Sequence, residues 1–160
     1  MMERMIYMLL FLFTSLQSSA CMPSENRVKN EIQRDTIANK KVMKLKITMG
    51  DKVLTAILYE NPTTRDFIAQ LPLTVDMEDF AGKEKIFYPP KKLSTKERKA
   101  VSDPKIGDIN VYAPWGNIAI FYGSYSGSRD LVRIGRITED IDRFNVTGTI
   151  KNIYFELDEQ

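Results

Sequence analysis

The chain of 160 residues contains no histidine and only one cysteine, and 23 Lys and Arg nearly balance 21 Asp and Glu. Without histidine there is no Ser-His-Asp or Cys-His catalytic arrangement, no histidine base and no histidine-ligated zinc. A single cysteine forms neither an internal disulfide nor a cysteine-rich metal site. A net charge of +2 gives no reason to expect nucleic acid as a partner. We therefore expect no metal and no cofactor.

The N-terminal segment contains an apolar run that is too short to cross a membrane. Residues 5–13 are all apolar, whereas a membrane-spanning helix needs ~20 such residues. The run fits the apolar region of a signal peptide, and small residues follow it directly before Cys21. This pattern resembles a bacterial lipoprotein signal, which is cut before a cysteine whose thiol then carries a lipid. We expect residues 1–20 to be a signal peptide.

Two alternatives for this segment stay open, namely an ordinary signal peptide with an incidental cysteine, and a retained N-terminal helix. The position of the only cysteine at the expected cleavage point favours lipidation. Residues 21–41 are polar with few aliphatic side chains, which is typical of a flexible tether. The expected location is the bacterial cell envelope, with the exported protein anchored to the membrane through a lipid on Cys21.

From residue 42 onward the pattern is that of short β-strands. Residues 43–49 alternate between apolar and polar side chains, as a half-buried strand does. Gly50 and Asp51 form a turn signal, so this strand and the apolar run 53–59 are predicted to make a hairpin. Further strands are predicted at residues 73–77, 109–113, 118–122, 131–137 and 149–157.

One short helix is predicted between the second and third strands. Asn61 or Thr63 can cap its first N–H groups, Pro62 suits its first turn, and Pro72 ends it. Residues 86–88 are a short apolar island, and residues 91–105 are expected to form a long loop. About seven short strands with glycine and proline turns predict a mainly β domain over residues 42–160, closed or nearly closed as a barrel.

Several segments of residues 42–156 together resemble the cyclophilin-like fold. The run Pro-Thr-Thr-Arg-Asp-Phe at 62–67 is similar to the P-x-T-x-x-N-F motif that begins the first cyclophilin helix. Residues 107–122, with the run Ala-Pro-Trp-Gly-Asn, resemble the central strand pair, and the Asp-Phe-Ala-Gly run at 79–82 resembles the small bacterial cyclophilin-like subfamily. The resemblance implies a closed eight-stranded antiparallel barrel with one or two short helices.

Many cyclophilins isomerise prolyl peptide bonds, which requires no acid, base or nucleophile. Rotation about the amide has a barrier of ~20 kcal/mol, and an apolar pocket with a cationic donor near the amide nitrogen lowers it. The family's catalytic arginine lies in a F-x-R-x-x-x-x-F motif, but the corresponding residues 74–87 include no arginine. The family's Q-F-F residues correspond to Ile118, Ala119 and Ile120. We therefore expect no efficient isomerase and no catalytic residues.

The candidate ligand site lies around Trp115 and Asn117, in a turn between two predicted strands. A tryptophan beside glycine and proline can form a stacking wall for a ligand, although it could equally pack over the barrel end. The small polar segment 123–129 includes Tyr125 and Arg129, and its N–H groups could hold an anion. A plain loop between strands explains the same composition. The predicted ligand-binding residues are Trp115, Asn117, Tyr125 and Arg129.

The function that the sequence favours is non-covalent binding of a small molecule or peptide by a membrane-anchored cyclophilin-like domain. The first alternative is a prolyl isomerase or folding helper of the envelope, for which Arg65, Arg129 or Arg136 would have to converge on an apolar pocket. The second alternative is a structural interaction module of the envelope, which a flat surface without a pocket would favour.

Overall fold

The computed structural model describes residues 42–96, 100–101, 103–126, 128 and 130–158. The expected signal peptide, Cys21, the tether at 21–41 and Arg129 lie outside these residues. Lys41–Gln160 forms one compact unit, and every described strand and both hydrophobic clusters belong to it. The described barrel strands and their core therefore all lie within this segment. Within the described residues, no helix is long and apolar enough to cross a membrane.

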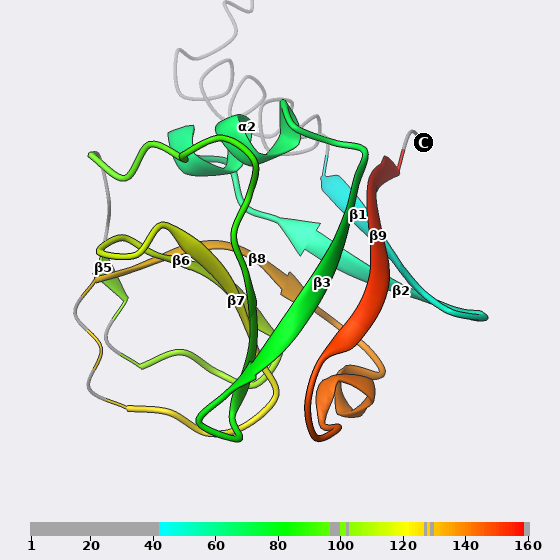
Figure 1. The fold of residues 1–160 in the computed structure, drawn as a ribbon. Helices are drawn as coiled ribbons and strands as arrows, with labels where there is room; N and C mark the ends of the chain where they lie inside the picture. The colour runs from blue at the N-terminus through cyan, green and yellow to red at the C-terminus, as the bar shows by residue number, and fades with distance from the viewer. Residues whose placement is uncertain (1–41, 97–99, 102, 127, 129, 159–160) are drawn as a thin grey trace, which may run out of the picture. The chain divides into compact units, whose positions relative to one another are not determined.

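The described strands form one antiparallel sheet, and eight of them close into a barrel (Figure 1). Around the barrel the order is β2-β1-β9-β3-β4-β7-β6-β8, and pairing of β8 with β2 closes it. The ninth strand, β5, pairs only with β8. The closed antiparallel cyclophilin-like barrel that the sequence predicted is thus confirmed. The strands are β1 (Met43–Met49), β2 (Lys52–Leu58), β3 (Leu73–Phe80), β4 (Glu84–Phe87), β5 (Ala100–Val101), β6 (Asp108–Tyr112), β7 (Asn117–Phe121), β8 (Leu131–Ile137) and β9 (Ile150–Asp158).

The predicted first hairpin is present, and its register follows from the alternation of its side chains. Leu45 faces Ala56 and Ile47 faces Leu54 across the pair, and all four are buried in the core. Gly50 has φ +60° in the connecting turn, a conformation that glycine adopts without steric cost. A shift by one residue would expose this whole apolar set, so burial of one face fixes the register.

The helix α2 (Pro62–Ile68) covers one end of the barrel, and the short 3₁₀ turn η1 (Ile141–Phe144) lies at the other (Figure 1). Asn61 caps α2, because its side-chain oxygen accepts from the N–H of Thr64 at 2.9 Å. The amide nitrogen of Asn61 also donates to the carbonyl of Arg133 at 3.0 Å, which ties the helix start to β8. Phe67 is buried and meets Phe155 edge to face at 6.4 Å between ring centres. Capping and one buried aromatic thus hold this helix on the barrel.

A fully buried lysine joins the β3–β4 hairpin to the chain before β9. The Nζ atom of Lys85 donates to Asp79 at 2.8 Å, to the carbonyl of Gly148 at 2.7 Å and to the carbonyl of Val146. The hydroxyl of Tyr122 donates to the same Asp79 oxygen at 2.6 Å. The hydrogen bond from Lys85, followed by that from Tyr122, lowers the pKa of Asp79. Buried charges need such compensation, so this group fixes the arrangement of four segments.

Two strands were not predicted. The segment treated as an apolar island belongs to β4, which begins earlier with Glu84 and Lys85. The expected loop at 91–105 contains the two-residue strand β5. Both strands depend on pairing with distant segments, β7 for the first and β8 for the second. Their residues show no alternation of their own, and that explains why the sequence pattern did not reveal them.

Candidate functional site

The sheet around β7 is covered on its outer face as well as its inner one. Ile118 and Ile120 belong to the barrel core, whereas Ala119 and Phe121 belong to a second hydrophobic cluster outside it. Successive side chains of a strand point to opposite faces, so Asn117 shares the outer face with Ala119 and Phe121. All five residues of β7 are buried. The outer face of β7 is therefore covered by side chains of the second cluster, which pack outside the barrel.

A cavity of about 440 Å³ lies over this outer face, a size typical of small-molecule sites. Strands β3, β4, β7, β6 and β8 all contribute to it, together with the loops after β6 and β7. Five aromatic residues, two aliphatic ones and four polar ones line it: Phe80, Tyr112, Trp115, Phe121 and Tyr125; Ile86 and Leu131; and Glu84, Asn117, Ser128 and Asp130.

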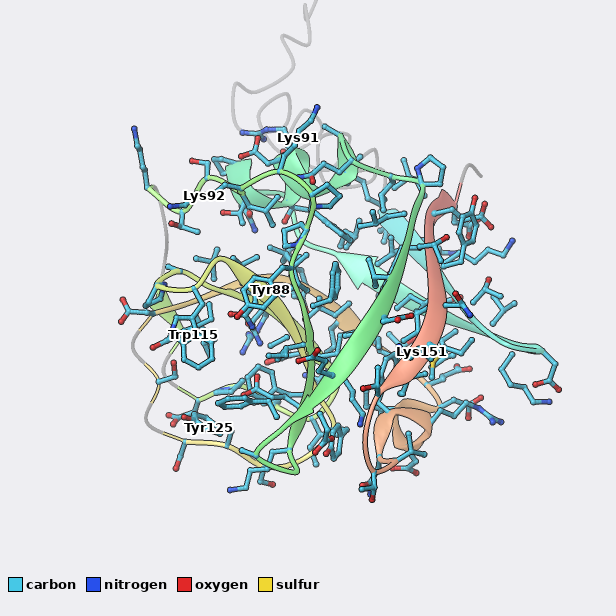
Figure 2. All side chains as sticks on the ribbon, in the orientation of Figure 1. Tyr88, Lys91, Lys92, Trp115, Tyr125 and Lys151 are labelled. Atoms are coloured by element: carbon cyan, nitrogen blue, oxygen red, sulfur yellow. The ribbon has the colours of Figure 1, made fainter. Side chains whose placement is uncertain are left out.

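The aromatic residues form two groups on the cavity wall. The ring of Trp115 contacts Phe80 edge to face at 5.5 Å and Tyr112 edge to face at 5.4 Å, measured between ring centres. Tyr125 contacts Phe121 at 5.9 Å. Trp115 keeps 53% of its surface exposed, and it lies on the same side of the barrel as Tyr125 (Figure 2). Rings held by other rings, with open faces, are suited to packing against a ligand.

Two polar side chains at the cavity are buried and lack partners. Glu84 is only 8% exposed, and it makes no hydrogen bond or ion pair with a described residue. Burial raises the pKa of Glu84 to about 7. Asn117 is 2% exposed, and its Oδ1 atom accepts no hydrogen bond. An unpaired buried carboxylate is costly, so Glu84 is available to a ligand, whereas Oδ1 of Asn117 has no surface open to one.

The structure brings three of the four predicted ligand-binding residues, Trp115, Asn117 and Tyr125, to the rim and wall of this one cavity. Arg129 lies outside the described residues. Sequence reasoning missed Phe80 and Glu84, which reach the cavity from the β3–β4 hairpin. The Asp-Phe-Ala-Gly run was recognised as a family likeness, but its contribution to a site depends on β4 pairing with β7.

The two described arginines among those that an isomerase would need, Arg65 and Arg136, are directed elsewhere. Arg65 pairs with Glu60 on the surface. Arg136 donates to the carbonyl of Ile106 at 3.3 Å and lies 3.8 Å from a carboxylate oxygen of Asp108. Among the described residues that line the cavity there is no arginine or lysine. Nor does the described part of the chain contain a group of three or more His, Cys, Asp or Glu residues that could hold a metal ion.

A second hollow, of about 490 Å³, lies between the end of α2 and strands β1 and β9. Two of its three charged residues already pair with each other, since Lys46 lies 2.7 Å from Glu156. Both partners are partly exposed, and it includes none of the buried polar atoms without partners. The cavity at Trp115 is therefore the better candidate.

Residues 47–152 match the model of the cyclophilin-like family. The match covers more than half of the chain, and the chain belongs to this family. Among solved structures, the hypothetical protein AF2241 from Archaeoglobus fulgidus, determined in solution, is similar with a TM-score of 0.59 and 21% sequence identity. That likeness covers 72% of this chain and 94% of the other, and it shows the shared fold. No curated protein matches the chain.

Proposed function

We propose that this domain binds a small molecule, or a side chain of a peptide, non-covalently in the cavity walled by Trp115 and Tyr125. The observation that supports this function best is the pair of buried polar side chains, Glu84 and Asn117, at an aromatic cavity of about 440 Å³. Folding leaves Glu84 without a partner among the described residues, and a ligand would compensate it. A flat interaction module of the envelope would need neither the cavity nor these residues.

Prolyl isomerisation is the weaker candidate, because the charge at the cavity has the wrong sign. A catalyst of this reaction places a cationic donor near the amide nitrogen. The charged residues described at this cavity are Glu84 and Asp130, both acidic. A carboxylate cannot donate that hydrogen bond when ionised, and it would repel the electron pair that develops on a twisted amide nitrogen.

The binding proposal is tested with ¹⁵N-labelled Lys41–Gln160, titrated with small aromatic and aliphatic amines, alcohols and acids and with short X-Pro peptides. We expect shifts at the indole N–H of Trp115 and at the Asn117 amide. The shift at the Asn117 amide should be lost in Trp115→Ala. The matched control is Tyr88→Ala, because Tyr88 is an aromatic residue of similar exposure, 59%, outside the cavity lining. Shifts confined to other surfaces would refute the site.

The same samples decide the isomerase alternative by exchange spectroscopy on the X-Pro peptide. We expect no acceleration over the uncatalysed exchange, which takes tens of seconds or longer. Acceleration that is lost on replacement of a single arginine would make this protein an enzyme and overturn the proposal.

We further propose that the domain is exported and held on the membrane of the bacterial envelope by a lipid on Cys21. Support comes from the apolar run at 5–13 and from the small residues before the only cysteine. Metabolic labelling of the full chain with a palmitate analogue tests it, since label should be lost in Cys21→Ser. Equal labelling of the variant, or none in either chain, would refute the anchor.

A further inference from the structure

The charged side chains among the described cavity lining have one sign, and this restricts the ligand that the proposed function requires. Glu84 and Asp130 are the charged residues among the described lining, and both are acidic. The acceptor that this cavity leaves without a described partner is the Glu84 carboxylate, whereas Oδ1 of Asn117 has no surface open to a ligand. A site that presents acceptors and negative charge is complementary to a ligand that brings donors and positive charge.

The aromatic wall favours the same sign of charge. The faces of Trp, Tyr and Phe rings carry negative electrostatic potential, and they attract cations within about 6 Å of the ring centre. Trp115 and Tyr125 present such rings from opposite groups of the wall. Tyr125 already has the ammonium of Lys83 at 6.0 Å from its ring centre, although Lys83 does not line the cavity.

We propose that the ligand is an organic ammonium ion, a protonated amine bound with its charge next to Glu84 and an N–H group donating to the Glu84 carboxylate. Its hydrocarbon part packs against Ile86, Leu131 and the rings. This inference rests on the proposed function and names its ligand class. Because the Glu84 carboxylate accepts hydrogen bonds, an amine that keeps an N–H binds better than a quaternary ammonium, which has none.

Neutral and anionic ligands fit less well. A neutral alcohol could donate to the Glu84 carboxylate, but it would leave Glu84 without a countercharge. A carboxylate ligand would meet Glu84, and no described residue of the lining supplies a positive charge for it. Burying an unpaired charge is far costlier than burying a paired one. The ammonium ion is the ligand class that gives Glu84 both a donor and a countercharge.

The binding of an ammonium ion should depend on pH through Glu84. Burial holds its pKa at about 7 in the ligand-free protein, and a cation binds the ionised form. The other titratable lining groups are Asp130, Tyr112 and Tyr125. Tyr122 also acts on Glu84 electrostatically, but its own pKa is raised to about 12, foremost by burial, so it stays neutral. The affinity should fall between pH 8.5 and 5.5, by at most about tenfold per pH unit.

The test uses Lys41–Gln160 with four probes of one shape: benzylammonium, benzyltrimethylammonium, benzyl alcohol and benzoate. Trp115 is the only tryptophan of the chain, so its fluorescence reports the cavity directly, and amide shifts confirm the location. At pH 8.5 we expect benzylammonium to bind about tenfold or more tighter than benzyl alcohol, as an ion pair and cation–π contact together would give. Benzyltrimethylammonium should bind less tightly than benzylammonium.

In Glu84→Gln the preference for benzylammonium over benzyl alcohol should fall to about threefold or less, while benzyl alcohol binding stays. Asp76→Asn, which removes an exposed carboxylate outside the cavity, is the matched control and should leave the preference unchanged. The unmodified protein gives an independent measurement, because its affinity for benzylammonium alone should fall at pH 5.5.

The outcomes separate this inference from the proposed function. Binding of benzyl alcohol or benzoate at Trp115 as tight as that of benzylammonium would refute the ammonium ligand and leave the binding function standing. A preference that survives in Glu84→Gln, or that is unchanged at pH 5.5, would also refute it. No response of Trp115 or Asn117 to any probe would count against both.

Discussion

Replacing Glu84 by glutamine should stabilise the ligand-free barrel at alkaline pH, because it removes a carboxylate that is buried in the folded state. The ordinary glutamate pKa of 4.5 applies in the unfolded chain, and burial raises it to about 7 in the folded one. Between pH 4.5 and about 7, Glu84 is protonated in the folded state and ionised in the unfolded state. Stability therefore falls as pH rises through this window, and the loss is complete above the folded pKa.

The magnitude follows from the distance between the two pKa values. Each pH unit between them corresponds to ~1.4 kcal/mol, so ionising Glu84 in the folded state costs at most ~3.4 kcal/mol. Part of this loss of stability occurs below pH 5.5, where ordinary carboxylates also titrate. Solvent in the open cavity screens the Glu84 charge and makes the remaining loss smaller. We expect the unfolding free energy of the wild-type barrel to fall by ~1–2 kcal/mol between pH 5.5 and 8.5.

Urea unfolding of Lys41–Gln160 at a series of pH values measures this directly. The chain has no histidine, so no side chain with an ordinary pKa between 5.5 and 8.5 obscures the result. Glu84→Gln should flatten the dependence and be more stable than wild type at pH 8.5. Glu78→Gln, an exposed glutamate of β3, is the control. Equal slopes in wild type and Glu84→Gln would refute the reasoning.

Three further outcomes are expected from the same unfolding measurements. Asp79→Asn removes the ion pair of the fully buried Lys85 and should cost ~3 kcal/mol. Asp76→Asn breaks only an exposed pair and should cost far less; similar losses for the two would show that burial does not matter here. Gly135→Ala should cost ~2 kcal/mol, because the new Cβ would lie 2.8 Å from a backbone oxygen of β2. An unchanged midpoint for Gly135→Ala would mean that β2 and β8 can separate easily.

The barrel could be predicted from the sequence wherever a strand keeps one face in the core. The β1–β2 hairpin is the best example, since its alternation and the Gly50 turn fix both elements and register. The helix α2 could also be predicted, because capping by Asn61 and the fixed φ of Pro62 are local effects. In each case the residues that determine the element lie within it.

Strand β4 could not be predicted, because its burial pattern contradicts its composition. Two of its four residues, Glu84 and Lys85, are charged, and both are buried. Lys85 is compensated by Asp79 and by carbonyl groups near Gly148, more than sixty residues further along the chain. Glu84 faces a cavity that forms only when β4 pairs with β7. The sequence of β4 by itself therefore reveals neither the carbonyl groups near Gly148 nor the cavity.

Some residues of the candidate site could be predicted from the sequence, and others could not, for the same reason. Trp115 and Tyr125 stand out in the sequence as aromatic residues in turn and loop segments, where side chains that do not pack in the core are often available to ligands. Glu84 does not stand out, since a glutamate before a lysine is typical of a solvated surface. Its importance depends on the sheet order, which places β4 between β3 and β7.

The site residues also bear on how far the family likeness extends to function. The resemblance implies an arginine within residues 74–87, but this segment has none, and its charged residue at the cavity is Glu84. Where it implies Q-F-F, Ile118 and Ile120 turn into the barrel core and leave only Ala119 on the outer face. A barrel can keep its fold through such changes, because the core face of β7 stays apolar. The outer face is then open to different chemistry, and a carboxylate among aromatic rings selects for cations rather than for the polarised amide of a proline.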